Sequence, residues 1–437
     1  MQKNTTSNLL GFHYFPDSAH YTNKDLNFAL EHLSKLNAGW LVLRSEATRA
    51  IPETFIAGLI NKGITPIIHF PLSLPNSPSA ADIKAILNAY AKWGIKYVIL
   101  FDRPNDSSSW SASGWSQSNL VESFLDRFVP LANECLNFGI TPVFPALTPG
   151  GSYWDLSFFK LALQALQRRG QKALLNKMAL ASYACTFDHP LDWGQGGTDR
   201  WPNNMPYITA ANSQDQVGFN QYQWLEGIAE KVLGNPLPVI LLGLDRKDLS
   251  SNNLYSDSES VDLVKQIKTF LSSMEQSAAP ESPILAGNFW LFSAAAKDQN
   301  TDSAWVREDG TTSAAYAVFS GTGPSVSSET KNASTKNEQS ATTAATSDHP
   351  ILHYLLLPKY EWGISDWHLE VIKPFILKHQ PTVGFSLAEA GLAKKVTVVG
   401  GEQSFSDEDL SNLRKNGSEV DRISGDGTSI ATQLAER

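Results

Sequence analysis

The sequence has few of the features that mark several common protein classes. Its 437 residues include only two cysteines, Cys135 and Cys185, too few for a disulfide framework or a cysteine-rich metal site. We expect both to be free, buried thiols, one in a helical segment and one at a strand end. The net charge of −9 argues against a nucleic-acid surface, which requires clustered Lys and Arg.

Long apolar runs are also missing. No segment approaches the roughly 18 apolar residues of a transmembrane helix, and none of signal-peptide length precedes Phe15. We therefore expect no transmembrane segment and a cytoplasmic protein. A non-classical route to the cell surface or the extracellular space stays open.

The composition is that of an ordinary folded protein, with 42% hydrophobic and 18% charged residues. The length allows one large domain and a smaller one. Twelve tryptophans are many for this size. Flat apolar rings serve both core packing and sugar binding, so this excess suggests a glycan site without deciding it.

Short, nearly continuous apolar runs recur along residues 1–320, as expected of strands buried on both faces of a parallel sheet. The segments between them, such as 25–36 and 261–274, have helical periodicity. Gly63, Gly94 and Gly139 each end one helix and lead into the next run. The pattern predicts a (β/α)8 TIM barrel. A doubly wound open sheet is the competitor, but its glycine-rich first loop is missing. The apolar runs are residues 9–15, 40–44, 64–70, 97–102, 140–146, 178–184, 237–243 and 284–292.

The composition changes at residue 321. Residues 321–348 are rich in Ser, Thr, Ala, Asn and Lys, which predicts a flexible linker. Residues 349–437 predict a small α/β domain. Its expected strands are 351–357, 396–399 and 420–423, and its expected helices are 366–378, 387–394 and 407–415.

Polar and aromatic residues follow the predicted strands, at the barrel end where functional groups gather. Two long connections, 102–118 and 185–215, add tryptophans, and loops of this length are usually functional. Such a ring suits a glycan, which needs hydrogen bonds and flat faces. The candidate binding residues are Arg44, Glu46, His69, Arg103, Asn105, Trp110, Trp115, Tyr183, His189, Trp193, Trp201 and Trp290.

Other roles for these residues remain open. Arg44, Asp102, Arg103, Asp245 and Arg246 could form ion pairs that close the barrel mouth. His13 and His69 could be core histidines, and no third ligand at metal spacing accompanies them. We therefore expect neither a metal nor a cofactor.

Three segments resemble the clan of (β/α)8-barrel glycoside hydrolases whose strand-4 Glu is the acid/base and strand-7 Glu the nucleophile. They are Asp102-Arg103-Pro104-Asn105, the strand-7 approach 233–240, and Trp290 after strand 8. The resemblance covers about residues 9–320. In this sequence Arg103 stands where the acid is expected and Gly243 where the nucleophile is expected. An Arg cannot donate a proton near neutral pH.

These substitutions predict a barrel that binds a glycan but is catalytically impaired, as in a pseudoenzyme. The first alternative is an active glycoside hydrolase that uses relocated Asp102 and Asp245. Strand alternation would turn Asp102 away from the cavity unless a bulge re-aims it. The second alternative is a structural or surface-interaction protein.

The C-terminal segment resembles one copy of a cell-wall-binding repeat of bacterial surface proteins. The resemblance rests on residues 395–401, 405–410, 416–417, 420–425 and 428–436. It implies attachment to a wall polymer, so a polysaccharide or cell-wall glycan is the expected partner. An unrelated α/β unit would give a similar pattern. The sugar, the linkage and the oligomeric state have no signature in this sequence.

Overall fold

The computed structural model forms two compact units. One comprises residues 1–204 and 209–325, and the other residues 205–208 and 326–437. The structure describes residues 8–74, 76–204, 208–210, 212–250, 257–276, 284–321, 349, 351–358, 366–379, 381–425, 427–435 and 437. The predicted linker, 321–348, lies almost wholly outside these residues.

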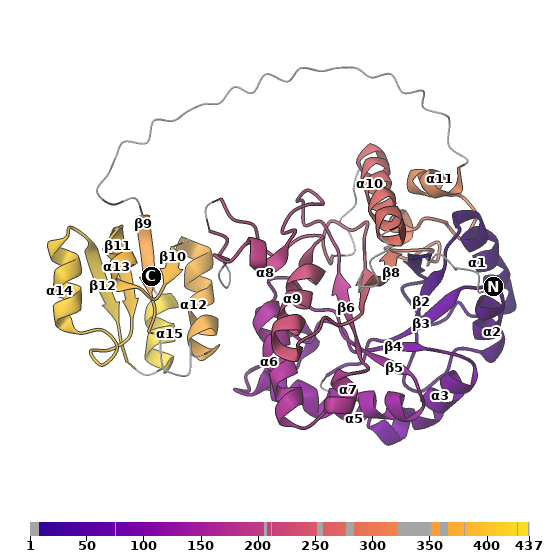
Figure 1. Cartoon of the computed structure of the whole chain (residues 1–437), viewed down its shortest axis with the longest axis horizontal. Coiled ribbons are helices and arrows are strands. Elements are labelled where there is room, and N and C mark those ends of the chain that lie inside the picture. Colours follow the sequence, from indigo (N-terminus) through magenta and orange to yellow (C-terminus); the bar gives the residue numbers. More distant parts are fainter. Residues whose placement is uncertain are drawn as a thin grey trace, which may run out of the picture. The chain divides into compact units, whose positions relative to one another are not determined.

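The first unit is a (β/α)8 barrel, which confirms the predicted fold (Figure 1). Eight parallel strands among the described residues close the barrel, because β1 pairs with both β2 and β8. The strands are β1 (Leu10–His13), β2 (Trp40–Arg44), β3 (Thr65–Phe70), β4 (Tyr97–Leu100), β5 (Thr141–Phe144), β6 (Ala179–Tyr183), β7 (Val239–Leu242) and β8 (Ile284–Phe289).

Helices surround the strands (Figure 1). The longer ones are α1 (Asn23–Leu36), α2 (Glu53–Asn61), α3 (Ala80–Lys92), α5 (Leu120–Asn137), α6 (Asp155–Arg168), α9 (Gln221–Leu233), α10 (Asp257–Gln276) and α11 (Ala314–Ser320). Single turns lie in the connections: η1 (Ser107–Ser109), α4 (Ala112–Trp115), α7 (Lys172–Leu175), α8 (Gly197–Arg200) and η2 (Thr301–Ser303).

The strands are largely apolar because their two faces contribute to two different cores. On β3, Ile67 belongs to a cluster built mainly from strand residues, inside the barrel, whereas Ile68 packs in the large cluster shared with the helices. Both cysteines are free and buried, as expected. Cys185 lies in the inner cluster and Cys135, on α5, in the outer one.

Local signals set the ends of the helices. Thr22 begins α1 and Ser79 begins α3, each in a capping box with the acidic residue three positions later. The predicted stops at Gly63, Gly94 and Gly139 have φ of 78°, 91° and 75°, a backbone conformation that favours glycine. The predicted helix-ending glycines are therefore confirmed, whereas α1 and α10 begin two and four residues before the predicted segments 25–36 and 261–274.

The second unit contains a parallel sheet of four described strands in the order β10-β9-β11-β12. Its elements are β9 (Ile351–Leu356), α12 (Asp366–His379), β10 (Thr382–Gly384), α13 (Leu387–Ala390), β11 (Ala393–Val399), α14 (Asp407–Lys415), β12 (Glu419–Ile423) and α15 (Gly427–Ala435). The sequence prediction missed β10. It also made the helix at 387–394 too long, because β11 already begins at Ala393 and pairs there with Ile351.

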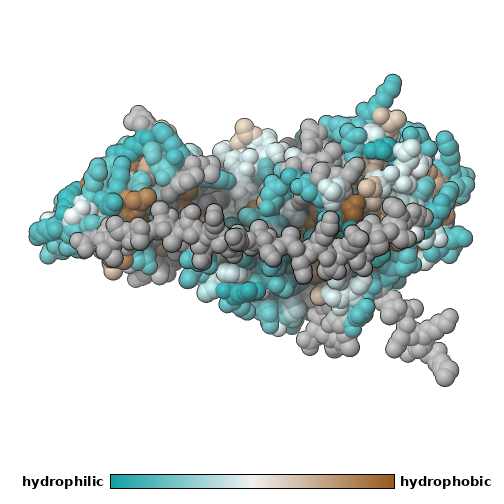
Figure 2. Space-filling model, turned by 90° about the horizontal axis from the view of Figure 1, so that it is seen from above, coloured by the Kyte–Doolittle hydropathy of each residue, from teal (hydrophilic) through white to brown (hydrophobic). Residues whose placement is uncertain are grey.

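Hydrophilic residues dominate the face drawn in Figure 2, where hydrophobic residues form only small patches among the described ones. Leu352 and Leu392 are the large hydrophobic residues exposed in the described parts of the chain, at 73% and 48%. No helix within the described ranges is long and apolar enough to cross a membrane.

Gly11 offers a test of how tightly the barrel closes. A Cβ there would lie 2.7 Å from Cβ of Trp40 and closer still to Oδ1 of Asn288. Because strands β2 and β8 fix these neighbours, Gly11→Ala should lower the free energy of unfolding by about 1–3 kcal/mol through overpacking. Chemical denaturation of the purified protein measures this.

Gly227→Ala is the matched control. Gly227 lies within α9, and a Cβ there would meet nothing nearer than Oγ1 of Thr198, at 3.5 Å. This substitution should be neutral or stabilising by up to about 1 kcal/mol. Equal effects at the two glycines would contradict the packing described at the closure.

Candidate functional site

A cavity of about 450 Å³ opens at the carboxyl ends of the barrel strands. We call it the central cavity. Strand ends and the segments directly after them supply most of its walls, and the loop after β8 supplies the rest. Its lining residues are His13, Phe15, Pro16, Val42, Arg44, His69, Pro71, Asp102, Arg103, Tyr183, Arg246, Leu249, Trp290, Asp298, Gln299 and Asn300.

Asp102 faces this cavity, although strict strand alternation would turn it away. Ile99 points into the barrel, and both Leu100 and Phe101 pack in the outer core. Phe101 achieves this through a left-handed backbone with φ of 68°, and its ring packs against Phe124 of α5. The irregular residue shifts the alternation by one position, so the next side chain returns to the inside.

Both carboxylate oxygens of Asp102 already hold donors. Tyr183 donates its hydroxyl proton to Oδ1 at 2.6 Å, and Nε of Arg103 donates to Oδ2 at 3.1 Å. Burial, followed by the charge of Asp102, raises the pKa of Tyr183 well above its ordinary value. Tyr183 therefore remains a protonated donor, and the three side chains form one connected group.

Two neutral histidines also line the cavity, His13 on β1 and His69 on β3. Burial chiefly, with help from His69 and Arg246, lowers the pKa of His13 to about 3. Burial also lowers the pKa of His69, against the opposing effect of Asp102. Nε2 of His69 lies 3.1 Å from the carbonyl oxygen of Phe101 and must carry the proton, because a carbonyl only accepts.

Asp245 occupies a structural position beside the cavity rather than in its wall. Its carboxylate accepts from the backbone N–H of Trp290 and from Nε1 of Trp305, both at 2.7 Å. Burial raises the pKa of Asp245 to about 6. The relocated nucleophile considered for this residue therefore lacks a free oxygen, and Asp245 instead ties the segment after β7 to the one after β8.

Trp290 is the tryptophan that lines the central cavity, and one of its faces is already covered. The guanidinium carbon of Arg246 lies 4.6 Å from the centroid of its ring. His13 lies 5.0 Å away in a tilted arrangement. The peptide bond between Trp290 and Leu291 is cis. Trp290 thus forms part of the wall of the central cavity and also positions Arg246.

The other predicted tryptophans lie outside this cavity. Trp110 is 9% exposed and donates Nε1–H to the carbonyl of Pro104. Trp115 is partly buried against the outer core. Trp193 donates to Asp215, and Trp201 donates to the carbonyl of Gln195. None of these four tryptophans lines the central cavity, and the indole N–H groups of Trp110, Trp193 and Trp201 bind loop residues. A stacking role for them stays a prediction.

Three more predicted residues also lie elsewhere. Asn105 is fully buried, and its amide bonds the backbone of Thr148 and Tyr153, so it joins two loops. His189 stacks on Trp193 with 4.0 Å between ring centroids. Glu46 accepts from Ser18 and Arg49 and lines a neighbouring cavity.

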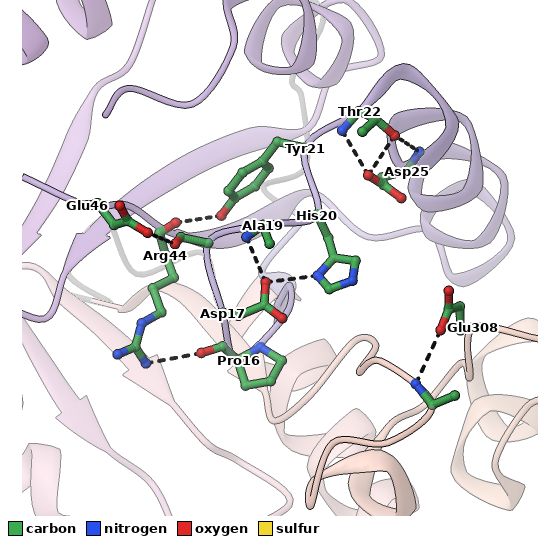
Figure 3. Close-up of polar contacts among 12 residues, drawn as sticks. Pro16, Asp17, Ala19, His20, Tyr21, Thr22, Asp25, Arg44, Glu46 and Glu308 are labelled. Atoms are coloured by element: carbon green, nitrogen blue, oxygen red, sulfur yellow. Dashed lines mark hydrogen bonds and ion pairs between the residues drawn. The ribbon is translucent and has the colours of Figure 1, made fainter. Parts of the chain in front are cut away.

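That second cavity, of about 530 Å³, shares Pro16, Arg44 and Pro71 with the central one. Figure 3 shows the loop after β1, where Arg44 donates to the carbonyl of Pro16 at 3.1 Å. In the same loop Asp17 accepts from Ala19 and pairs with Nδ1 of His20. Arg44 thus stands where the two cavities meet.

Sequence reasoning missed part of the wall, namely the loop residues Asp298, Gln299 and Asn300. The long connection after β8 was a signal for them, since it separates that strand from α11. Among the described residues, no group of three His, Cys, Asp or Glu side chains is placed to hold a metal ion.

Fold and cavity together define a (β/α)8-barrel protein with a ligand-sized cavity at the carboxyl ends of its strands. No protein-family model and no curated protein matches the sequence. Among solved structures, a family 39 glycoside hydrolase from Bacteroides cellulosilyticus WH2 is 14% identical with a TM-score of 0.46, covering 71% of this chain and 62% of its own.

Two further structures are similar. A monomeric β-xylosidase from Caulobacter crescentus CB15 is 11% identical with a TM-score of 0.45, covering 72% of this chain and 67% of its own. A GH128 (subgroup II) endo-β-1,3-glucanase from Sorangium cellulosum is 13% identical with a TM-score of 0.37, covering 71% of this chain and 97% of its own.

The structural assignment of Asp245 predicts a graded loss of stability. Asp245→Ala removes both acceptors and leaves the N–H groups of Trp290 and Trp305 without partners, which should lower the free energy of unfolding by about 2–4 kcal/mol. Asp245→Asn keeps one acceptor and should cost roughly half as much. Denaturation followed by tryptophan fluorescence measures the series.

Asp192, an exposed residue, supplies the control. Asp192→Ala should change the unfolding free energy by less than about 0.5 kcal/mol. An Asp245→Ala protein as stable as the Asp192→Ala protein would contradict the structural role.

Proposed function

We propose that the barrel binds a glycan in the central cavity and hydrolyses it poorly or not at all. The observation that carries the proposal is the character of this cavity. It is large enough for a sugar ring and rich in hydrogen-bonding groups from several strands, but both oxygens of Asp102 and one oxygen of Asp298 are already engaged. The two carboxylate oxygens of Asp102 accept hydrogen bonds from Tyr183 and Arg103. Asp298 accepts from the backbone and side-chain nitrogens of Asn300.

The chemistry of glycoside hydrolysis explains why engaged carboxylates matter. One carboxyl group must protonate the leaving oxygen while another attacks or activates water, at separations of about 5–5.5 Å or 6.5–9.5 Å. Arg103 stays protonated and cannot act as the acid. Gly243 has no side chain, and Asp245 is bound to two tryptophan N–H groups. The proposal is thus a pseudoenzyme that keeps a binding site.

An active hydrolase is the second candidate, and one observation favours it. Asp102 faces the cavity after all, because Phe101 shifts the strand alternation. A catalytic pair would then combine Asp102 with Asp298, the other carboxylate among the described lining residues. Substrate binding would have to displace Arg103 or Tyr183 from Asp102 first.

For the second unit we propose attachment to a bacterial cell-wall glycan. Support comes from the sequence resemblance to cell-wall-binding repeats, together with a compact parallel α/β sheet that accommodates the matching segments as β11, α14 and β12. The partner of the whole chain would then be a polysaccharide at the cell surface, with the barrel and the second unit each contacting glycan.

The proposal predicts binding without turnover. Isothermal titration against soluble polysaccharide fragments should reveal a ligand, and incubation with that ligand should release no reducing ends. Trp290→Ala should weaken binding about tenfold, because it removes part of the cavity wall and the ring on which the Arg246 guanidinium packs. Trp201→Ala, outside the cavity, is the matched control and should bind as wild type.

Turnover decides between the two candidates. Hydrolysis by the wild type that disappears in Asp102→Asn and in Asp298→Asn would establish an active hydrolase and contradict the pseudoenzyme proposal. Binding that is equally unaffected by Trp290→Ala and Trp201→Ala would place the glycan outside the central cavity.

A further inference from the structure

The central cavity carries more positive than negative charge. Three guanidinium groups line it, those of Arg44, Arg103 and Arg246, against the carboxylates of Asp102 and Asp298. Arg103 is neutralised by Asp102, its neighbour in sequence, at 3.1 Å. The other two arginines form no ion pair with any carboxylate among the described residues.

Both of these arginines are held by neutral groups that leave most of their donors free. Nη1 of Arg44 donates to the carbonyl of Pro16 at 3.1 Å, and Nη2 of Arg246 donates to the carbonyl of Ser250 at 2.8 Å. The ring of Trp290 supports the guanidinium of Arg246 from one side. A guanidinium has five N–H donors, so each keeps several for a ligand.

Among the remaining described groups of the wall, only the carboxylate of Asp298 opposes this charge. His13 and His69 are neutral, since burial lowers the pKa of each. Nε2 of His13 is buried without a hydrogen-bond partner, and so is Oδ1 of Asn300. His13 is 8% exposed and Asn300 5% exposed, and both line the cavity. The wall therefore combines two unpaired cations with polar atoms that have no partner inside the described protein.

We infer that the glycan held in the central cavity is anionic, and that Arg44 and Arg246 bind its negative group. This inference rests on the proposed glycan binding and narrows it to a substrate class. The planar guanidinium fork matches a carboxylate, a sulfate or a phosphate, each of which presents two oxygens to it. A neutral sugar would offer these two guanidinium groups no anionic oxygen to pair with.

The position of Arg44 indicates how such a glycan lies. Arg44 lines both the central cavity and the second cavity, together with Pro16 and Pro71. A ligand longer than one sugar would pass this residue as it extends from one cavity to the other. Anionic groups of the glycan would then bind to Arg44, where the two cavities meet, and to Arg246.

The test measures how tightly the full chain binds charged sugars and their neutral counterparts. Titration calorimetry at low salt would use glucuronate, glucose 6-sulfate and glucose 6-phosphate, with glucose and methyl glucuronate as the uncharged partners. We expect at least one charged sugar to bind about tenfold or more tightly than its neutral partner. Which of the three does so identifies the anionic group.

Substitutions then locate the recognition. Arg44→Gln and Arg246→Gln should each lower the affinity ratio of charged to neutral sugar about tenfold. Arg44→Lys should retain part of this ratio, because Lys keeps the positive charge but lacks the planar guanidinium. Arg168→Gln is the control, since Arg168 is an exposed arginine that pairs with Glu122 on the outer helices. It should keep the full preference. Near-UV circular dichroism verifies that each variant is folded.

The outcomes separate this inference from the proposed function. Equal affinity for charged and neutral sugars, with binding still sensitive to Trp290→Ala, would overturn the anionic class and leave glycan binding standing. No binding of any sugar or polysaccharide fragment would overturn both. A charge preference that Arg168→Gln lowers as much as Arg44→Gln would also overturn the inference, because the effect would then be one of overall charge.

Discussion

The closure of the sheet is the constraint on which the rest of this molecule depends. Pairing of β1 with β8 puts every barrel strand between an inner and an outer core, so successive side chains must enter different cores. Apolar residues on both faces follow directly from this. Closure also gathers the carboxyl ends of all strands around one mouth, which is why side chains from distant parts of the chain share a single cavity.

A break in that alternation after β4 gives the site its character. The left-handed residue Phe101 keeps two successive side chains in the outer core and sends Asp102 inward. The carboxylate then meets Tyr183 from β6 and Arg103 beside it. Without the break, the cavity would lose its connected acidic group and gain a phenyl ring. Local backbone geometry thus decides the polarity of this wall.

The fold was predictable from the sequence, and the site only in part. Apolar runs and helix-ending glycines specify the barrel because they are local signals that tertiary packing reinforces. Arg44, His69, Arg103, Tyr183 and Trp290 line the central cavity, since each lies at or just after a strand, and their binding role stays a prediction. The loop tryptophans lie outside this cavity, because their positions depend on partners such as the Pro104 carbonyl and Asp215, which no periodicity reveals.

The two free cysteines report separately on the two cores. Burial raises the pKa of each thiol to about 12, so neither forms the reactive thiolate near neutral pH while the barrel is intact. Cys185 belongs to the inner cluster and Cys135 to the outer one. The rate at which each is alkylated therefore measures how often its own layer opens, and the molecule carries a natural pair of probes for stepwise unfolding.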